Sequence, residues 1–174
     1  VAVQHWGEPR FTKDVDMTLL TGFGHEESFV DDFLSAYAAR IDEARDFALK
    51  NRVLLLRSER GIGIDIALGA LPFESAAVSR AQRIEIEAGA FLRLCTAEDL
   101  IVMKAFAIRT MDWNDVRGVL VRQGTKNLDW PYIQRHLQPL CEVKEAPEIL
   151  DQLDQLRREV AQSEPKAPGH SRHQ

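Results

Sequence analysis

The chain has 174 residues, and its 22 Lys and Arg against 27 Asp and Glu give a formal net charge of -5. At about 150 residues per domain, this length predicts one globular domain with an appended helical part. A composition of 45% hydrophobic and 28% charged residues excludes a wholly disordered chain. We expect no membrane span, because the sequence has no run of about 18 apolar residues. The acidic balance argues against broad binding to duplex DNA, although it does not exclude a local basic patch.

Cysteine usage is sparse. Cys95 and Cys141 lie far apart in the chain and lack the spacing of metal ligands. This pattern is typical of a protein from a reduced compartment rather than of a disulfide scaffold. We therefore expect a cytoplasmic protein.

Hydrophobic periodicity in the first half predicts strands that alternate with short helices. A helix ends near residue 6, and further helices are expected at 28–39, at 44–50 and in the loop after Pro72. Strands are expected at 10–20, 52–57, 62–68, 82–87 and 91–95.

The second half is predicted to be helical. The expected helices cover 100–109, 114–122, 130–137 and 146–161. The sequence thus predicts an α+β fold, in which a small mixed β-sheet flanked by helices precedes a helical C-terminal half. The predicted parts are an α/β core at 1–95, a helical part at 96–162 and a disordered tail at 163–174.

Asp14 and Asp16 are the first candidate site residues. In a strand, residues two apart point to the same face, so their Cα atoms lie about 6–7 Å apart. Two like charges at this separation raise each other's pKa unless a cation lies between them. A divalent ion such as Mg²⁺ suits a carboxylate pair. The alternative is a solvated edge strand, because Asp-x-Asp often occurs by chance.

Asp65 interrupts an otherwise apolar strand pattern, in which isoleucines occupy the other face. An acid is disfavoured in a strand, and the neighbours Gly63 and Ala67 are too small to cover it. If this strand lies beside the Asp-x-Asp strand, three carboxylates converge on one patch. Such a triad can hold two metal ions for in-line phosphoryl transfer. The alternative is an exposed acid on the outer face of an antiparallel sheet.

Lys104 lies in an apolar stripe of the helix predicted at 100–109. A lysine in such a stripe either extends its ammonium group into solvent or meets an anion. Asp112 and Asp115 would continue this face if the helix persisted beyond Ile108. The alternative is that Asp112 or Asn114 caps a new helix.

Three segments together carry a family resemblance. They are Arg-Phe-Thr-Lys-Asp-Val-Asp at 10–16, the strand with Asp65, and Glu98 to Ala105 with Arg109 and Asp112. This pattern resembles the AbiEii/AbiGii-type nucleotidyltransferases of the DNA polymerase β-like superfamily, many of which are toxins of bacterial toxin–antitoxin or phage-defence pairs. The resemblance covers residues 1–125.

The resemblance implies that Asp14, Asp16 and Asp65 are the catalytic, metal-binding carboxylates and that Mg²⁺ is the cofactor. Lys104 would contact the triphosphate, with Asp112 near the same pocket. The implied nucleotide-binding residues are Arg10, Thr12, Lys104, Arg109 and Asp112.

The implied reaction transfers a nucleoside monophosphate from an NTP to a hydroxyl acceptor and releases pyrophosphate. In related toxins the acceptor is an RNA end, typically that of tRNA, and a cognate antitoxin protein is the expected partner. Arg10, Lys13, Lys104 and Arg109 would supply local positive potential despite the acidic balance of the chain.

The chain departs from the superfamily pattern at its start. A Gly-Gly or Gly-Ser turn normally precedes the Asp-x-Asp strand, and here it would fall just before Val1. We therefore expect either a longer natural chain or a variant with weakened nucleotide binding. A weakened relative would bind a nucleotide or a protein partner without turnover. A plain interaction domain with coincidental acids would instead have Asp14 and Asp65 on opposite sides of the sheet.

Overall fold

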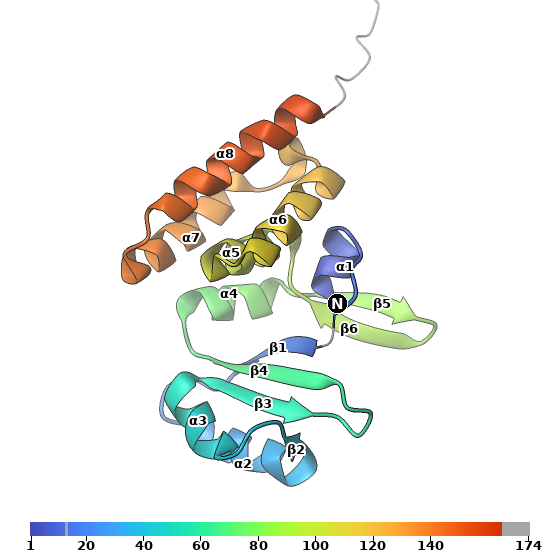
Figure 1. The fold of residues 1–174 in the computed structure, drawn as a ribbon, viewed down its shortest axis with the longest axis vertical. Coiled ribbons are helices and arrows are strands. Elements are labelled where there is room, and N and C mark those ends of the chain that lie inside the picture. The colour runs from blue at the N-terminus through green and yellow to red at the C-terminus, as the bar shows by residue number, and fades with distance from the viewer. Residues whose placement is uncertain (13, 165–174) are drawn as a thin grey trace, which may run out of the picture. The chain divides into compact units, whose positions relative to one another are not determined.

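The computed structural model describes residues 1–12 and 14–164 (Figure 1). These residues form two compact units. Of the described residues, the sheet unit contains Val1, 10–12 and 14–96, and the helical unit contains 2–9 and 97–164. The chain is an α+β protein with a small mixed sheet flanked by helices and a helical C-terminal half, so the predicted fold class is confirmed.

A four-stranded sheet in the order β1-β4-β3-β2 organises the sheet unit. Its strands are β1 (Asp14–Leu20), β2 (Ala38–Ala39), β3 (Val53–Arg57) and β4 (Gly63–Gly69). The edge strand β1 runs parallel to β4, whereas β3 is antiparallel to both β4 and β2. Parallel neighbours need a crossover connection, and here α2 (Glu26–Ala36), β2, α3 (Ala44–Asn51) and β3 provide it.

One face of this sheet is apolar, because every second residue of β3 and β4 is Leu or Ile. The core residues, each at most 1% exposed, are Val30, Ala48, Leu54, Leu56, Ile66 and Leu68. Helices α2 and α3 cover this face, and α4 (Pro72–Arg80) lies on the other side of the sheet (Figure 1). Burial of each large aliphatic side chain contributes about 1.5–3 kcal/mol. The core of the sheet unit therefore lies between this face of the sheet and helices α2 and α3.

The strands β5 (Gln82–Glu87) and β6 (Ala90–Leu94) form a separate two-stranded hairpin. Gly89 closes its turn at a φ of 79°, a conformation that glycine adopts without strain. The Arg83 guanidinium lies 3.7 Å from the centroid of the Phe91 ring. This contact joins the two strands across the hairpin.

The helical unit consists of α1 (Ala2–Trp6), α5 (Ala97–Ala107), α6 (Thr110–Gln123), a 3₁₀ turn (Thr125–Asn127), α7 (Trp130–Lys144) and α8 (Glu148–Ser163). Its largest fully buried side chains are Ile101, Val102, Val116, Leu120, Ile133, Leu137 and Ile149. Gly118 lets the chain after α1 approach α6 closely, because a Cβ there would lie 3.0 Å from the backbone nitrogen of Glu8. Among the described residues, no helix combines the length and apolarity needed to cross a bilayer.

Some element boundaries differ from the predicted ones. β1 begins at Asp14 rather than Arg10, because β4, its pairing partner, begins opposite Asp14 at Gly63. The helix predicted to reach residue 39 ends at Ala36, and the next residues pair with β3 as β2. Ser163, at the start of the predicted tail, is the last residue of α8. Lys13 and residues 165–174 lie outside the described residues.

Candidate functional site

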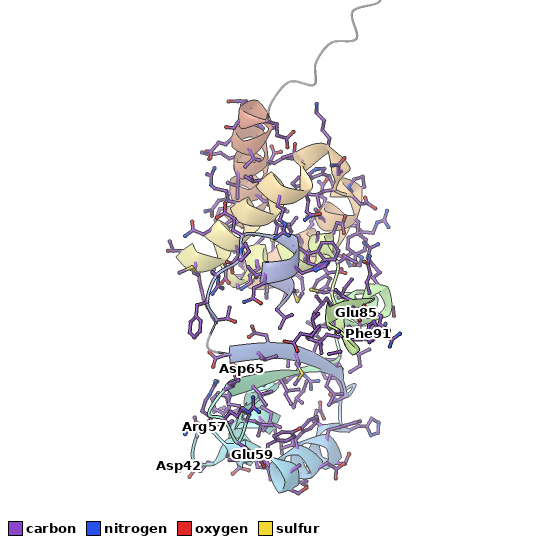
Figure 2. All side chains as sticks on the ribbon, turned by 90° about the vertical axis from the view of Figure 1, so that its right-hand side faces the viewer. Asp42, Arg57, Glu59, Asp65, Glu85 and Phe91 are labelled. Atoms are coloured by element: carbon purple, nitrogen blue, oxygen red, sulfur yellow. The ribbon has the colours of Figure 1, made fainter. Side chains whose placement is uncertain are left out.

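The strand register brings the three predicted carboxylates to one face of the sheet. Asp16 is the register partner of Asp65, and Asp14 is that of Gly63. Neighbouring strands lie about 4.8 Å apart, and residues two apart in a strand share a face. Asp14, Asp16 and Asp65 therefore lie on the face opposite the apolar core, which we call the carboxylate face. Figure 2 labels Asp65. A plain interaction domain with coincidental acids was expected to have Asp14 and Asp65 on opposite sides of the sheet, and this arrangement contradicts that expectation.

Gly63 keeps the carboxylate face open. It occupies the middle strand between Asp14 on β1 and Arg57 on β3. A Cβ at this position would overlap with Asp14 Oδ1 and would lie 2.5 Å from Arg40 Nη1. The Asp14 carboxylate can therefore fold over β4 only because residue 63 has no side chain.

Arg40 is the residue of this face that the sequence did not reveal. Its backbone nitrogen donates to Leu55 O at 3.0 Å, and Leu55 is the register partner of Asp65. The guanidinium Nη1 donates to Asp14 Oδ1 at 3.2 Å, and Nη2 lies 2.6 Å from Asp65 Oδ1. The exposed fractions of the Arg40, Asp14 and Asp65 side chains are 25%, 48% and 28%. Sequence periodicity gave no sign of Arg40, because β2 has only two residues.

The electrostatics of the face centre on Asp65. Burial raises the pKa of Asp65 above its ordinary value; Arg40 opposes this shift, whereas Asp16 and Asp14 add to it. Arg40 Nη2 is close to Asp65 Oδ1 but is not aligned for a hydrogen bond, and no other described residue donates to this buried oxygen. Asp65 Oδ1 therefore retains its capacity to accept a proton or a hydrogen bond.

The donor set suits a divalent cation chemically. Carboxylate oxygens are the protein ligands that Mg²⁺ prefers, and the face carries three aspartates on two adjacent strands. Among the described residues, however, no three His, Cys, Asp or Glu side chains are grouped closely enough to hold a metal ion. The Arg40 guanidinium instead contacts two of the three carboxylates.

A second charged cluster, the Lys104 cluster, lies in the helical unit. Lys104 Nζ donates to Asp112 Oδ1 at 2.7 Å and lies 3.1 Å from Asp115 Oδ2. The side chain of Lys104 is 21% exposed, and those of Asp112 and Asp115 are 8% and 3% exposed. The lysine thus meets an anion, which was one of the two predicted alternatives.

The local backbone explains how this cluster forms. Helix α5 ends at Ala107, and Ile108 has a φ of 54°, so the face of Lys104 does not continue along one helix. Helix α6 begins at Thr110 with Arg109 as its N-cap residue. Asp112 is therefore in the first turn of α6, and the alternative in which Asp112 or Asn114 caps this helix is wrong.

The ammonium group of Lys104 lies between two acids. Burial tends to lower the pKa of Lys104, but the hydrogen bonds that Lys104 donates to Asp112 and Asp115 outweigh burial and raise the pKa. Arg109 Nε lies 4.0 Å from Asp112 Oδ2, which accepts no hydrogen bond from a described residue. Lys104 therefore already has two anionic partners, and a triphosphate at its ammonium group would have to compete with them.

The remaining predicted residues, Arg10 and Thr12, are half-buried in the segment before β1. The structure thus gathers Asp14, Asp16 and Asp65 in the sheet unit and Lys104, Arg109 and Asp112 in the helical unit. No protein-family model matches the chain, and no curated protein matches it.

Proposed function

We propose that the protein is a Mg²⁺-dependent nucleotidyltransferase that transfers a nucleoside monophosphate from an NTP to a hydroxyl acceptor. The observation that supports this proposal is the pairing of Asp16 with Asp65 on adjacent parallel strands, with Asp14 on the same face. Bound Mg²⁺ would neutralise phosphate charge and acidify the attacking hydroxyl. Three carboxylates on an open, partly exposed face provide the oxygen ligands that this chemistry needs.

Each aspartate has a role in this proposal. Asp14 and Asp16, on the edge strand, would hold the ion together with triphosphate oxygens. Asp65, whose Oδ1 lies 2.6 Å from Arg40 Nη2, would also bind the ion and, once released from Arg40, would take the proton of the acceptor hydroxyl. A carboxylate with a raised pKa is a stronger base than an ordinary one. The acceptor oxygen then attacks the α-phosphorus, and pyrophosphate leaves.

The resemblance to AbiEii/AbiGii-type enzymes supports a more specific version of the proposal. In this version the acceptor is an RNA end, such as the 3′ end of tRNA, and the protein is a cytoplasmic toxin with a cognate antitoxin. Arg10, Thr12, Lys104, Arg109 and Asp112 would then serve the nucleotide. Lys104 could reach a triphosphate only by giving up part of its contact with Asp112 and Asp115.

A second candidate is a catalytically weakened relative that binds a nucleotide or a protein partner. Two observations favour it: Arg40 contacts Asp14 and Asp65, and no three acidic side chains among the described residues are grouped to hold a metal ion. Calorimetry with Mg²⁺-NTP separates the two candidates. Binding without release of pyrophosphate would support the weakened relative.

A transfer assay tests the leading proposal. The full chain is incubated with α-labelled NTPs, Mg²⁺ and cellular RNA, and labelled RNA and pyrophosphate are measured. We expect transfer by the wild-type protein and a loss of about 10²–10⁴-fold in Asp65→Asn, because its proton acceptor is removed. Asp16→Asn should be similarly inactive.

Asp32→Asn is the matched control, because Asp32 is an exposed acid on α2, the helix that covers the opposite face. It should keep full activity. Transfer that is unchanged in Asp16→Asn, or absent from the wild-type protein with all four NTPs, would refute the proposal.

A further inference from the structure

Arg40 reaches across the carboxylate face from one edge of the sheet towards the other. It follows β2 at one edge of the sheet, and its guanidinium reaches Asp65 on β4 and Asp14 on β1 at the other edge. Two separate guanidinium nitrogens contact the two carboxylates, Nη1 at 3.2 Å and Nη2 at 2.6 Å. Among the described residues, Arg40 is the cation that forms ion pairs with these aspartates.

The space that the guanidinium occupies is provided by Gly63. A Cβ at this residue would lie 2.5 Å from Arg40 Nη1 and would overlap with Asp14 Oδ1. The positive charge therefore lies over the middle strand, between the strand positions of Asp14 and Asp65. This is also the region that a cation bound by the carboxylates would occupy.

We propose that Arg40 is a built-in counter-cation that competes with divalent metal ions for Asp14 and Asp65, so that metal binding must first break these ion pairs. This inference rests on the proposed function for its metal. The physical reason is that Mg²⁺ ligands lie at 2.0–2.1 Å from the ion, and a guanidinium bonded to the same oxygens would meet strong like-charge repulsion. Only one of the two cations can use these oxygens at a time.

Only molecules in which the ion pairs are broken can bind the metal ion. The apparent metal affinity is therefore the intrinsic affinity multiplied by the fraction of such molecules. Partly exposed ion pairs are each worth about 0.2–1 kcal/mol. Two such pairs correspond to a reduction of roughly 2- to 30-fold in metal affinity. Removal of the guanidinium should therefore raise the metal affinity by the same factor, roughly 2- to 30-fold.

The test measures Mn²⁺ binding to the full chain by electron paramagnetic resonance, with Mn²⁺ as the probe for Mg²⁺. The variants are Arg40→Gln, which removes the charge, and Arg40→Lys, which keeps it without the two-pronged contact. Arg45→Gln is the matched control, because Arg45 also contacts two acids, Asp31 and Glu27. Circular dichroism confirms that each variant is folded.

We expect Arg40→Gln to bind Mn²⁺ roughly 2- to 30-fold more tightly than the wild-type protein, with Arg40→Lys between them. Arg45→Gln should bind as the wild type does. Equal or weaker binding by Arg40→Gln would overturn the inference while leaving the metal site of the proposed function intact. Failure of every variant to bind Mn²⁺ at millimolar concentration would overturn both.

Discussion

The carboxylate face and the Lys104 cluster both bring one cation to two aspartates, but they differ in exposure. The aspartates that contact Arg40 are 48% and 28% exposed, whereas those that contact Lys104 are 8% and 3% exposed. Exposed ion pairs contribute little to stability and exchange readily with other ions. A buried pair is costly to break, because the remaining charge has no partner. Burial therefore favours a structural role for the Lys104 cluster, whereas the exposed carboxylate face is where we propose that a ligand binds.

Replacement of Lys104 should have the largest effect. In Lys104→Met, two nearly buried carboxylates lose their contact with the ammonium group, and we expect the free energy of unfolding to fall by about 3 kcal/mol. Urea denaturation followed by circular dichroism measures this change. Lys50→Met, at an exposed position on α3, should change it by less than about 0.5 kcal/mol. A similarly small loss in Lys104→Met would remove the distinction between the two clusters.

Gly63→Ala should separate stability from ligand binding on the carboxylate face. The new Cβ displaces the ends of the Asp14 and Arg40 side chains, both of which can turn towards solvent. The free energy of unfolding should change by less than about 1 kcal/mol, because alanine also restricts the unfolded chain. Mn²⁺ binding should nevertheless weaken, because the loss of Asp14 as a ligand outweighs the release of Arg40 from the carboxylates. Wild-type affinity in this variant would show that Asp14 need not lie over Gly63 to bind the ion.

The pH dependence of Asp65→Asn gives the smallest expected effect. The pKa of Asp65 is higher in the folded state than its ordinary value, so the folded state holds this proton more tightly than the unfolded state does. Ionisation of Asp65 therefore lowers stability as the pH rises from about 4 through the raised pKa. The melting temperature of Asp65→Asn relative to wild type should be higher at pH 7 than at pH 4. The opposite trend would mean that Arg40 outweighs burial.

The sequence predicted those features that depend on local periodicity. The alternation around Asp14, Asp16 and Asp65 predicted which side chains share a face, because side-chain direction in a strand follows from residue spacing alone. Arg40 could not be predicted in this way, since its position depends on a two-residue strand that pairs only in the folded sheet. The sequence predicted two helices here, but the position of the break between them, before Thr110 rather than near Asn114, was also hidden. It depends on the positive φ of Ile108, a conformation for which a β-branched residue gives no signal.

The parallel pairing of β1 with β4 also determines when the carboxylate face can form. Asp16 and Asp65 become neighbours only after the chain has passed through α2, β2, α3 and β3. Closing such a long segment costs chain entropy before the contact forms, and non-local pairings of this kind slow folding. During synthesis, a chain that has not yet extended past β4 carries Asp14 and Asp16 without their partner. The three carboxylates thus come together only when β4 pairs with the edge strand β1.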